Sequence, residues 1–269
     1  EEGNNTINIK IDDINSSDRQ EFRNLGYTDI NWYNDQTQQI YLVKSNEGDT
    51  NTVNIDIDNN SDDQRLAVNL IGSNNGQTRS GKNIVEGQIK TKGQAYFYMA
   101  DRYNDRLSSW DVDVDLENRK DSDQARVYID RISTTKASSF KFNAVSAYQA
   151  NVDINARYAS GDLTFNLLSE TTNENNSNAS AYLRLISGSG NDVIFAETKA
   201  SGLALSNSNT SSTVKGGAGD DLITGGSSKD SLYGETGNDT IKGGGNNDSL
   251  YGEAGDDKLE GGAGNDTIF

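Results

Sequence analysis

A nine-residue repeat at the C-terminal end of the chain constrains its fold more than any other sequence feature. Six units follow one another without insertion from residue 216 to residue 269. Each unit opens on Gly, has Asp at its sixth position and an apolar residue at its eighth. A short strand with a single inward apolar residue cannot fold alone, so the units must stack and join these residues in one core. The repeat therefore predicts a stack of β-coils.

The same spacing concentrates oxygen atoms at the turns between units. Gly permits the positive backbone angles and the close chain approach that tight turns require. Successive turns then bring carbonyl oxygens and Asp carboxylates into narrow spaces between coils, where negative charge accumulates. A divalent cation that takes about six to eight oxygen ligands would neutralise this charge. We therefore expect several Ca²⁺ ions to be bound there.

The units resemble the RTX nonapeptide, GGxGxDxUx with U apolar, which winds as a parallel β-roll with calcium between its turns. The resemblance covers residues 216–269. It implies that each unit forms half a coil, so that turns 18 residues apart share a cation, with four inter-turn sites in all. The implied metal-binding Asp residues form two edges, Asp221, Asp239 and Asp257 on the first and Asp230, Asp248 and Asp266 on the second. The implied Gly positions of the first edge are Gly216, Gly219, Gly234, Gly237, Gly252 and Gly255.

The two edges differ at the fourth position of the unit. The first edge has Gly throughout, whereas the second edge has Ser228 and Asn246 in its first two units, and Lys229 lies beside Asp230. We therefore expect weaker calcium binding at the Asp230 end. The segment SLYGE recurs with the 18-residue spacing, which predicts that its two tyrosines, Tyr233 and Tyr251, stack one coil apart.

Composition changes near residue 215 and divides the chain into two predicted modules. The last 54 residues hold 15 of the 27 Gly and no Arg. A further unit, SGSGNDVIF at 187–195, matches the nonapeptide with Asp192 at the metal-binding position. The second module is therefore expected to span residues 187–269, with regular repeats over 216–269, and the first to span residues 1–186.

Residues 1–186 show the period-two alternation of apolar residues that is typical of β-strands. A single short helix is expected, capped by Ser17 and ended by Gly26. The fold class expected for the whole chain is all-β, with a β-sandwich or β-solenoid module followed by a calcium-binding parallel β-roll. The alternating segments are 6–11, 39–44, 53–58, 66–71, 95–99, 112–116, 127–132, 140–145, 152–156, 163–168 and 181–186.

The composition also excludes several classes of function. The chain has no Cys and no His, which removes disulfides, thiol catalysis, zinc chemistry of the usual kind and any Ser-His-acid triad. A formal charge of −17 opposes binding to nucleic acid or to an anionic membrane surface. No run of 18 apolar residues is present, so no transmembrane segment is expected. The chain begins at Glu1, so a processed or excised product is expected.

The RTX resemblance implies a bacterial protein that is exported unfolded by type I secretion and folds outside the cell, where calcium is abundant. Within that setting we expect a non-enzymatic structural protein, such as a surface-layer, filament or matrix/adhesin subunit, whose partners are copies of itself. Strand ends without a cap, at Phe269 and in the N-terminal NNTINIKI segment, favour assembly.

Two alternatives stay open for the first module. One is a carbohydrate-binding adhesin module for a surface polysaccharide, in which Trp32, Tyr33 and Trp110 would offer stacking faces. The less favoured one is a polysaccharide lyase or epimerase that uses the loop within residues 96–111. Its candidate residues are Asp101, Arg102, Tyr103, Asp105 and Arg106.

Overall fold

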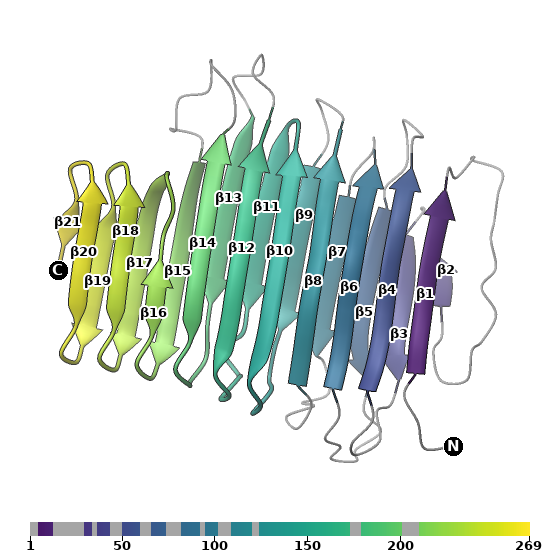
Figure 1. The fold of residues 1–269 in the computed structure, drawn as a ribbon, viewed down its shortest axis with the longest axis horizontal. Coiled ribbons are helices and arrows are strands. Elements are labelled where there is room, and N and C mark those ends of the chain that lie inside the picture. Colours follow the sequence, from purple (N-terminus) through teal and green to yellow (C-terminus); the bar gives the residue numbers. More distant parts are fainter. Residues whose placement is uncertain are drawn as a thin grey trace.

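The chain folds into two long β-sheets that face each other across one hydrophobic core (Figure 1). The fold is seen in a computed structural model. Among the residues described, every regular element is a strand. The helix expected between Ser17 and Gly26 lies outside them. The described residues are 5–12, 30–33, 37–43, 50–59, 66–73, 82–91, 95–101, 109–119, 124–172, 179–200 and 210–269.

The sheets are named A and B, and successive strands of the chain alternate between them after β3. The ten described strands of sheet A are, in spatial order, β1 (Asn5–Asp12), β4 (Thr50–Asn59), β6 (Lys82–Thr91), β8 (Ser109–Asn118), β10 (Ser138–Ser146), β12 (Leu163–Thr171), β14 (Val193–Ala200), β16 (Leu222–Thr224), β18 (Thr240–Gly245) and β20 (Lys258–Ala263). The eleven of sheet B are β2 (Ile30–Tyr33), β3 (Thr37–Val43), β5 (Leu66–Ser73), β7 (Ala95–Asp101), β9 (Gln124–Arg131), β11 (Gln149–Asn155), β13 (Ser180–Ile186), β15 (Thr210–Ala218), β17 (Lys229–Thr236), β19 (Ser249–Ala254) and β21 (Thr267–Ile268).

The strand pairing identifies the fold as a parallel β-solenoid. Among the described strands β2 and β3 pair in antiparallel fashion, and all other neighbouring pairs are parallel. Each coil therefore contributes one strand to each sheet. The all-β prediction is confirmed, and of its two alternatives for the first module the solenoid is the one observed, because neighbours within a sheet come from successive coils.

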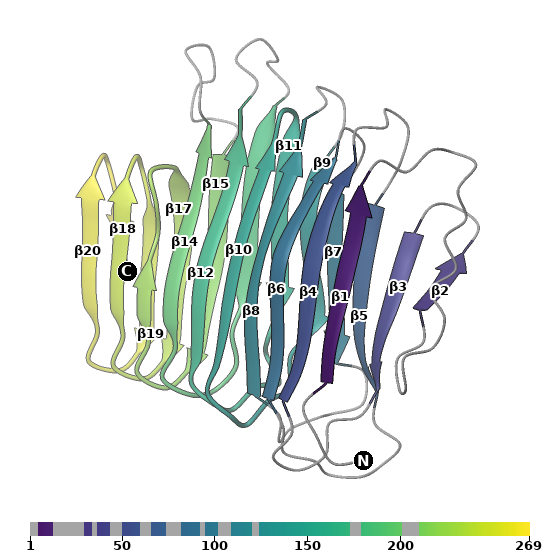
Figure 2. The ribbon, with the colours of Figure 1, turned by 45° about the vertical axis from the view of Figure 1, so that its right-hand side comes forward.

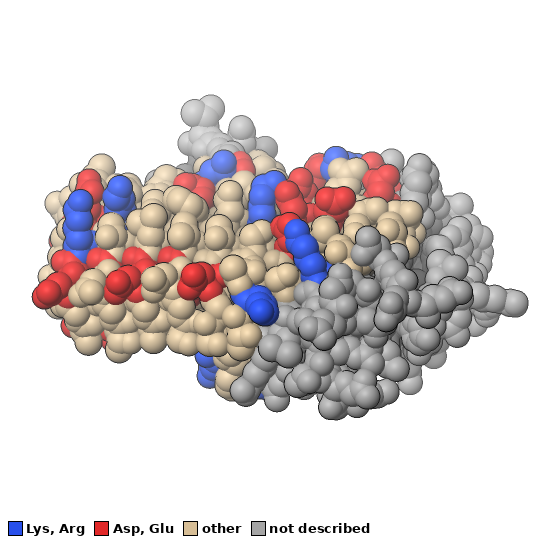
Figure 3. All heavy atoms as spheres, turned by 60° about the horizontal axis from the view of Figure 1, so that its bottom comes forward, with Lys and Arg blue, Asp and Glu red and all other residues tan. Residues whose placement is uncertain are grey.

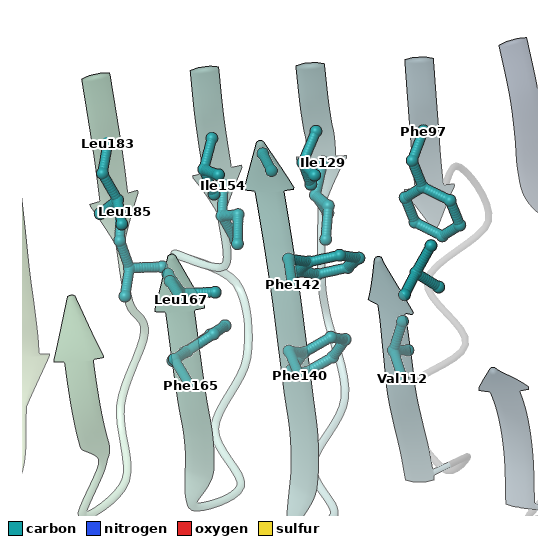
Figure 4. Close-up of a cluster of buried hydrophobic side chains, with 14 of the residues drawn as sticks. Phe97, Val112, Ile129, Phe140, Phe142, Ile154, Phe165, Leu167, Leu183 and Leu185 are labelled. Carbon is teal, nitrogen blue, oxygen red and sulfur yellow. The ribbon is translucent and has the colours of Figure 1, made fainter. Parts of the chain in front are cut away.

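The coils between β4 and β13, here called the wide coils, are held by large apolar side chains that form ladders along the sheets. Phe140 and Phe165 face each other in register with ring centroids 5.4 Å apart. Phe142, on the same strand as Phe140, packs across the core on Phe97 of sheet B, with ring centroids 5.3 Å apart. Figure 4 shows these rings between the two sheets. Alternation along each strand places one set of residues inside and the other in solvent.

The coils of residues 210–269, here called the narrow coils, repeat every 18 residues. Ile223 and Ile241 lie in register in sheet A, and Leu232 and Leu250 lie in register in sheet B. All four side chains are fully buried. On the outer face of sheet B, Tyr233 and Tyr251 stack with ring centroids 4.6 Å apart, which confirms the predicted stacking. The stack continues to Phe269, 4.7 Å beyond Tyr251.

Both sheets run without interruption across the boundary predicted at residues 186/187. Strand β12 pairs with β14 in sheet A, and β13 pairs with β15 in sheet B. Figure 2 shows the wide and narrow coils as one continuous stack, with shorter strands at its C-terminal end. The two predicted modules thus share their sheets and their core, while their division into separate units stays a prediction.

Candidate calcium-binding site

The turns between the narrow strands place the repeated Asp residues on two opposite edges of the solenoid. Asp221 lies between β15 and β16, and Asp239 lies between β17 and β18. These turns join sheet B to sheet A, at the bottom of Figure 1. Asp230 and Asp248 lie where the chain returns from sheet A to sheet B, at the opposite edge. The sixth positions therefore separate into two edges as their spacing indicates.

Each of these carboxylates uses one oxygen to tie its turn to the preceding coil. On the first edge, Asp221 donates its backbone N–H to Oδ1 of Asp239 at 2.8 Å, and Asp239 donates likewise to Asp257 at 2.9 Å. On the second edge, the N–H of Asp248 bonds Oδ1 of Asp266 at 3.0 Å. Asp230 donates to Oδ1 of Asp248 at 2.9 Å. Identical side chains thus form a hydrogen-bonded ladder along each edge.

The second oxygen of three carboxylates is left without a partner. Oδ2 of Asp221, Asp239 and Asp248 is buried and accepts no hydrogen bond from the residues described. Burial raises the pKa of Asp221 to about 7 and that of Asp248 to about 6, and it also raises the pKa of Asp239. A buried carboxylate oxygen with no donor and no counter-charge is costly, and a bound cation removes that cost.

The opening Gly of each unit makes room for this oxygen. A Cβ atom on Gly234 would lie 2.1 Å from Oδ2 of Asp239 and 2.9 Å from the carbonyl oxygen of Gly252 in the next coil. A Cβ on Gly216 would lie 2.3 Å from Oδ2 of Asp221 and also close to a carbonyl oxygen of the next coil. The first position is therefore Gly because a carboxylate and a carbonyl oxygen both approach its Cα.

The Gly at the fourth position lets successive turns of the first edge touch. Gly237 has φ 135°, and a Cβ there would lie 1.9 Å from the carbonyl oxygen of Gly219. On the second edge Asn246 takes φ 81°, a conformation that Asn adopts more readily than most residues. At Asn246 a residue other than Gly therefore occupies the fourth position with φ still positive.

The donor set fits calcium better than it fits a metal that needs a side-chain cage. Among the residues described, no three acidic side chains come close enough to hold an ion by themselves. An ion at the unpartnered Oδ2 atoms must therefore take backbone carbonyl oxygens as well. Calcium accepts such mixed, all-oxygen ligand sets in flexible geometry. The residues that would hold it are the buried Asp residues and the carbonyl groups of the adjoining Gly-rich turns, and their role as ligands stays a prediction.

Figure 3, which brings the bottom of Figure 1 forward, shows acidic side chains in a row along the turns of the first edge. A second ladder, which was not predicted from the sequence, lies on this edge at the fifth position of the unit. Asn191 donates its N–H to Asp162 Oδ1 at 2.9 Å, and Asp220 donates to Asn191 Oδ1 at 2.9 Å. The ladder continues from Asn238 to Asp220 and from Asp256 to Asn238. Its signal in the sequence is that the fifth position on this edge is always Asp or Asn.

The unit at residues 187–195 joins the same edge. Val193 pairs with Leu222, and the N–H of Asp192 donates to Oδ1 of Asp221 at 2.8 Å, across 29 residues. The carboxylate of Asp192 differs from its successors because its Oδ2 accepts a hydrogen bond from the hydroxyl of Ser187. These contacts place the unit one coil before Asp221 on the first edge, and its assignment to the roll stays a prediction.

Of the candidate residues outside the roll, the structure describes the side chain of Trp110. Trp110 is only 3% exposed and lies in the core, so it offers no stacking face to a sugar; its position on the inward side of β8 is the reason. Trp32 and Tyr33 belong to β2, and Asp101 ends β7, but their side chains are outside the described part. The other residues proposed for a lyase or epimerase site also lie outside it, namely Arg102, Tyr103, Asp105 and Arg106.

Within the described part of the chain no helix is long and apolar enough to cross a membrane. No curated protein and no solved structure matches the chain. The family model for the RTX calcium-binding nonapeptide repeat, which holds four copies, matches residues 208–241 and 233–268. Proteins with these repeats are generally secreted. The ladders of buried Asp residues and the family match together establish that residues 208–268 are RTX calcium-binding nonapeptide repeats and bind calcium.

Proposed function

We propose that this protein is an extracellular structural protein that folds on meeting calcium and then assembles with copies of itself, as a subunit of a surface layer, filament or adhesive matrix. The observation that carries the proposal is the continuity of the fold. The described strands form two uninterrupted sheets around a single core, from β1 to β21. A stack of this kind presents an extended, repeated surface along its length.

Calcium makes folding of the narrow coils depend on whether the chain is inside or outside the cell. At low calcium the buried oxygens of Asp221, Asp239 and Asp248 have no counter-charge, so the narrow coils are unstable. Outside the cell, an ion that binds only the folded state stabilises it by mass action. The net charge of −17 acts in the same direction, because it keeps the calcium-free chain open.

Sheet edges supply the means of assembly. Among the described strands of sheet A, β1 and β20 each have a neighbour on one side only, β4 and β18 respectively. An edge strand presents unpaired N–H and C=O groups, to which a strand of another copy can add. Two copies joined in this way would extend the ladders already present along the sheets.

Assembly can be tested by light scattering and negative-stain electron microscopy of the purified chain in millimolar calcium, in magnesium and in chelator. We expect ordered sheets or filaments in calcium alone. Asp239→Asn should abolish them, whereas Glu86→Gln, which removes one charge from an exposed position on β6, should not. Discrete monomers in all three conditions would rule out self-assembly.

A second candidate function, carbohydrate binding, is favoured by a groove of about 380 Å³ on the outer face of sheet B. Tyr182, which is 48% exposed, forms one wall. Arg126, Asn151 and Arg184 line the remainder, and Arg184 is held by Asp153 at 3.2 Å. An exposed aromatic ring flanked by planar hydrogen-bonding groups suits a sugar ring and its hydroxyl groups.

This alternative is separated from assembly by glycan-array binding of monomeric protein. Tyr182→Ala should remove binding, and Phe195→Ala, which truncates another ring of similar exposure, should leave it intact. Equal binding by the two variants would exclude this groove as the sugar site.

A further inference from the structure

The buried Asp residues on the two edges fall into two groups. In the first group, Asp221, Asp239 and Asp248, Oδ2 has no partner; these are the open carboxylates. In the second group, Asp192 and Asp230, serine hydroxyls donate to the carboxylate; these are the serine-capped carboxylates. Both groups are buried to the same degree, at 2% exposed or less. The difference between them is therefore one of hydrogen bonding and not of exposure.

We propose that the serine-capped carboxylates do not bind calcium, because serine hydroxyls replace the ion there, and that the coil beginning at Asp192 is a calcium-independent base on which the calcium-dependent coils build. The proposal assigns Ser187, Ser212 and Ser228 the role of determining which turns of the solenoid take an ion. It also means that Asp192, which the nonapeptide pattern includes among the metal ligands, is not one.

At Asp192 the Ser187 hydroxyl takes the place of the ion, because Ser187 lies in register with Gly216 of the next coil. The N–H of Ser187 bonds the carbonyl oxygen of Lys215, so Ser187 stands beside Gly216, at the first position of its own unit. The regular units have Gly there, and a Cβ on Gly216 would touch Oδ2 of Asp221. Ser187 places a side chain at the corresponding point and donates its hydroxyl to Oδ2 of Asp192. The other oxygen of Asp192 accepts the N–H of Leu163 at 2.7 Å.

At Asp230 the cap is more extensive. Oδ1 accepts the N–H of Ser212 at 3.2 Å, the hydroxyl of Ser212, and the hydroxyl of Ser228 at 3.3 Å. Oδ2 accepts the N–H of Gly226 at 2.9 Å. Ser212 lies in register with Asp230, where an Asp would stand if the ladder of the second edge continued for another coil. Both carboxylate oxygens are therefore satisfied without a cation.

The turn of Asp192 also stands where the narrow coils meet a wider one. Strand β14 buries Ile194 and Ala196, whereas β16 buries Ile223 alone. The coil that begins at Asp192 therefore has more apolar contact to hold it together. The first open carboxylate docks directly on this coil, because Oδ1 of Asp221 accepts the N–H of Asp192.

The first test uses the unaltered chain and hydrogen exchange followed by mass spectrometry, with calcium and with chelator. We expect residues 163–172 and 187–200 to keep their protection in chelator, while residues 237–269 lose theirs. If the segment 187–200 loses protection together with residues 237–269, calcium holds that coil too and the proposal is wrong.

Substitutions at the cap provide a second test. Ser187→Ala should speed exchange of residues 187–200 in chelator by roughly tenfold to a hundredfold, because it leaves a buried carboxylate oxygen without its donor. Ser189→Ala, in the same turn but exposed, is the matched control and should leave exchange unchanged. Ser187→Gly should give Asp192 the cradle found at Gly216 and raise the calcium stoichiometry measured by calorimetry by one ion.

Substitution of Asp192 itself provides a second calorimetric test. Asp192→Asn should leave the number of bound calcium ions unchanged, whereas Asp239→Asn should reduce it. A fall in stoichiometry with Asp192→Asn, or no gain with a folded Ser187→Gly protein, would show that the hydroxyl does not stand in for an ion.

Discussion

The wide and the narrow coils build the same two sheets with different interiors. Strand β8 of the wide coils turns Trp110, Val112, Val114 and Leu116 inward, whereas β18 of the narrow coils turns only Ile241 and Gly toward the core. Burial of apolar area contributes about 25 cal/mol per Å², so each wide coil has a large hydrophobic contribution that each narrow coil lacks. The comparison indicates that a coil of 18 residues is too thin to be held by its core alone and depends on its turns.

Calcium removal should have the largest effect, because it should unfold the narrow coils and leave the wide coils folded. Without the ion, the narrow coils retain buried carboxylates that have no counter-charge, while the wide coils keep their core. Trypsin should then cut the nonapeptides in chelator but not in calcium, and mass spectrometry would locate the cuts. The lysines of the six regular units are Lys229, Lys242 and Lys258, all exposed. Unchanged cleavage at these lysines after chelation would show that the narrow coils do not depend on calcium.

A core substitution in the wide coils should have the next largest effect. Phe142→Ala removes a fully buried ring that packs on Phe97 and should lower the free energy of unfolding by about 3–5 kcal/mol. The loss should be the same with and without calcium, as measured by denaturant unfolding followed through tryptophan fluorescence. Lys141→Ala, its exposed neighbour, should cost about 1 kcal/mol or less. A loss that appears only in calcium would mean that the wide coils also depend on the ion.

Within the narrow coils, the two edges should differ in calcium affinity. Asp239→Ala and Asp257→Ala should each weaken binding by more than the roughly 10–100-fold that the loss of an outer partner costs at a metal site. Asp230→Ala should weaken it less, because its oxygens are already bonded by serine and backbone donors. Calorimetry would compare them, with Glu260→Ala on β20 as an exposed control. Equal or reversed effects would refute the distinction between the edges.

Strict periodicity explains how much of the roll could be predicted from the sequence. The RTX resemblance implies that each unit forms half a coil. Because the repeat has no insertions, residues 18 apart then share an edge and a face, and the two Asp edges and the stack of Tyr233 and Tyr251 follow. Strand β6 could not be predicted in this way. Its inward positions include Asn83 and Gly87, which interrupt the apolar alternation although both lie in register with the neighbouring strands.

The serine caps could not be predicted either, because they depend on how coils of unequal length align. Asp192 and Asp221 are 29 residues apart, whereas Asp221 and Asp239 are 18 apart. Ser212 precedes the six regular units that begin at residue 216, and its position beside Asp230 is seen in the pairing of β15 with β17. The inward direction of Trp110 likewise depends on which face of β8 meets the core.

The stability of the calcium-free roll should depend on pH through the buried Asp residues of its turns. Burial raises the pKa of Asp221 from 3.8 to about 7, so the folded state binds a proton that the unfolded chain releases at mildly acidic pH. The calcium-free roll should therefore become more stable as pH falls from about 8 to about 5. Calcium affinity should change in the opposite direction, because the ion requires the ionised carboxylate. Thermal melts in chelator across this range would test the sign, and a fall in stability on acidification would contradict it.

The smallest expected effect concerns backbone strain at the second position of the unit. Glu253 has φ 71°, whereas the second-edge units have Gly at this position, with φ 112° at Gly244 and 97° at Gly262. A left-handed conformation costs a non-Gly residue about 1–2 kcal/mol, and Gly loses part of that advantage through its larger entropy in the unfolded chain. Glu253→Gly should therefore stabilise the calcium-bound roll by about 0.5–1 kcal/mol.

Glu235, at the same position of another unit, provides the comparison for the stability of Glu253→Gly. It has φ 78°, but its carboxylate lies 2.8 Å from Nζ of Lys215, so Glu235→Gly relieves strain and also removes an ion pair. Its melting temperature in calcium should rise less than that of Glu253→Gly. If both variants gain equally, the ion pair contributes nothing at this partly exposed site; if both lose stability, the Glu side chains contribute more to the narrow coils than their strained backbone costs.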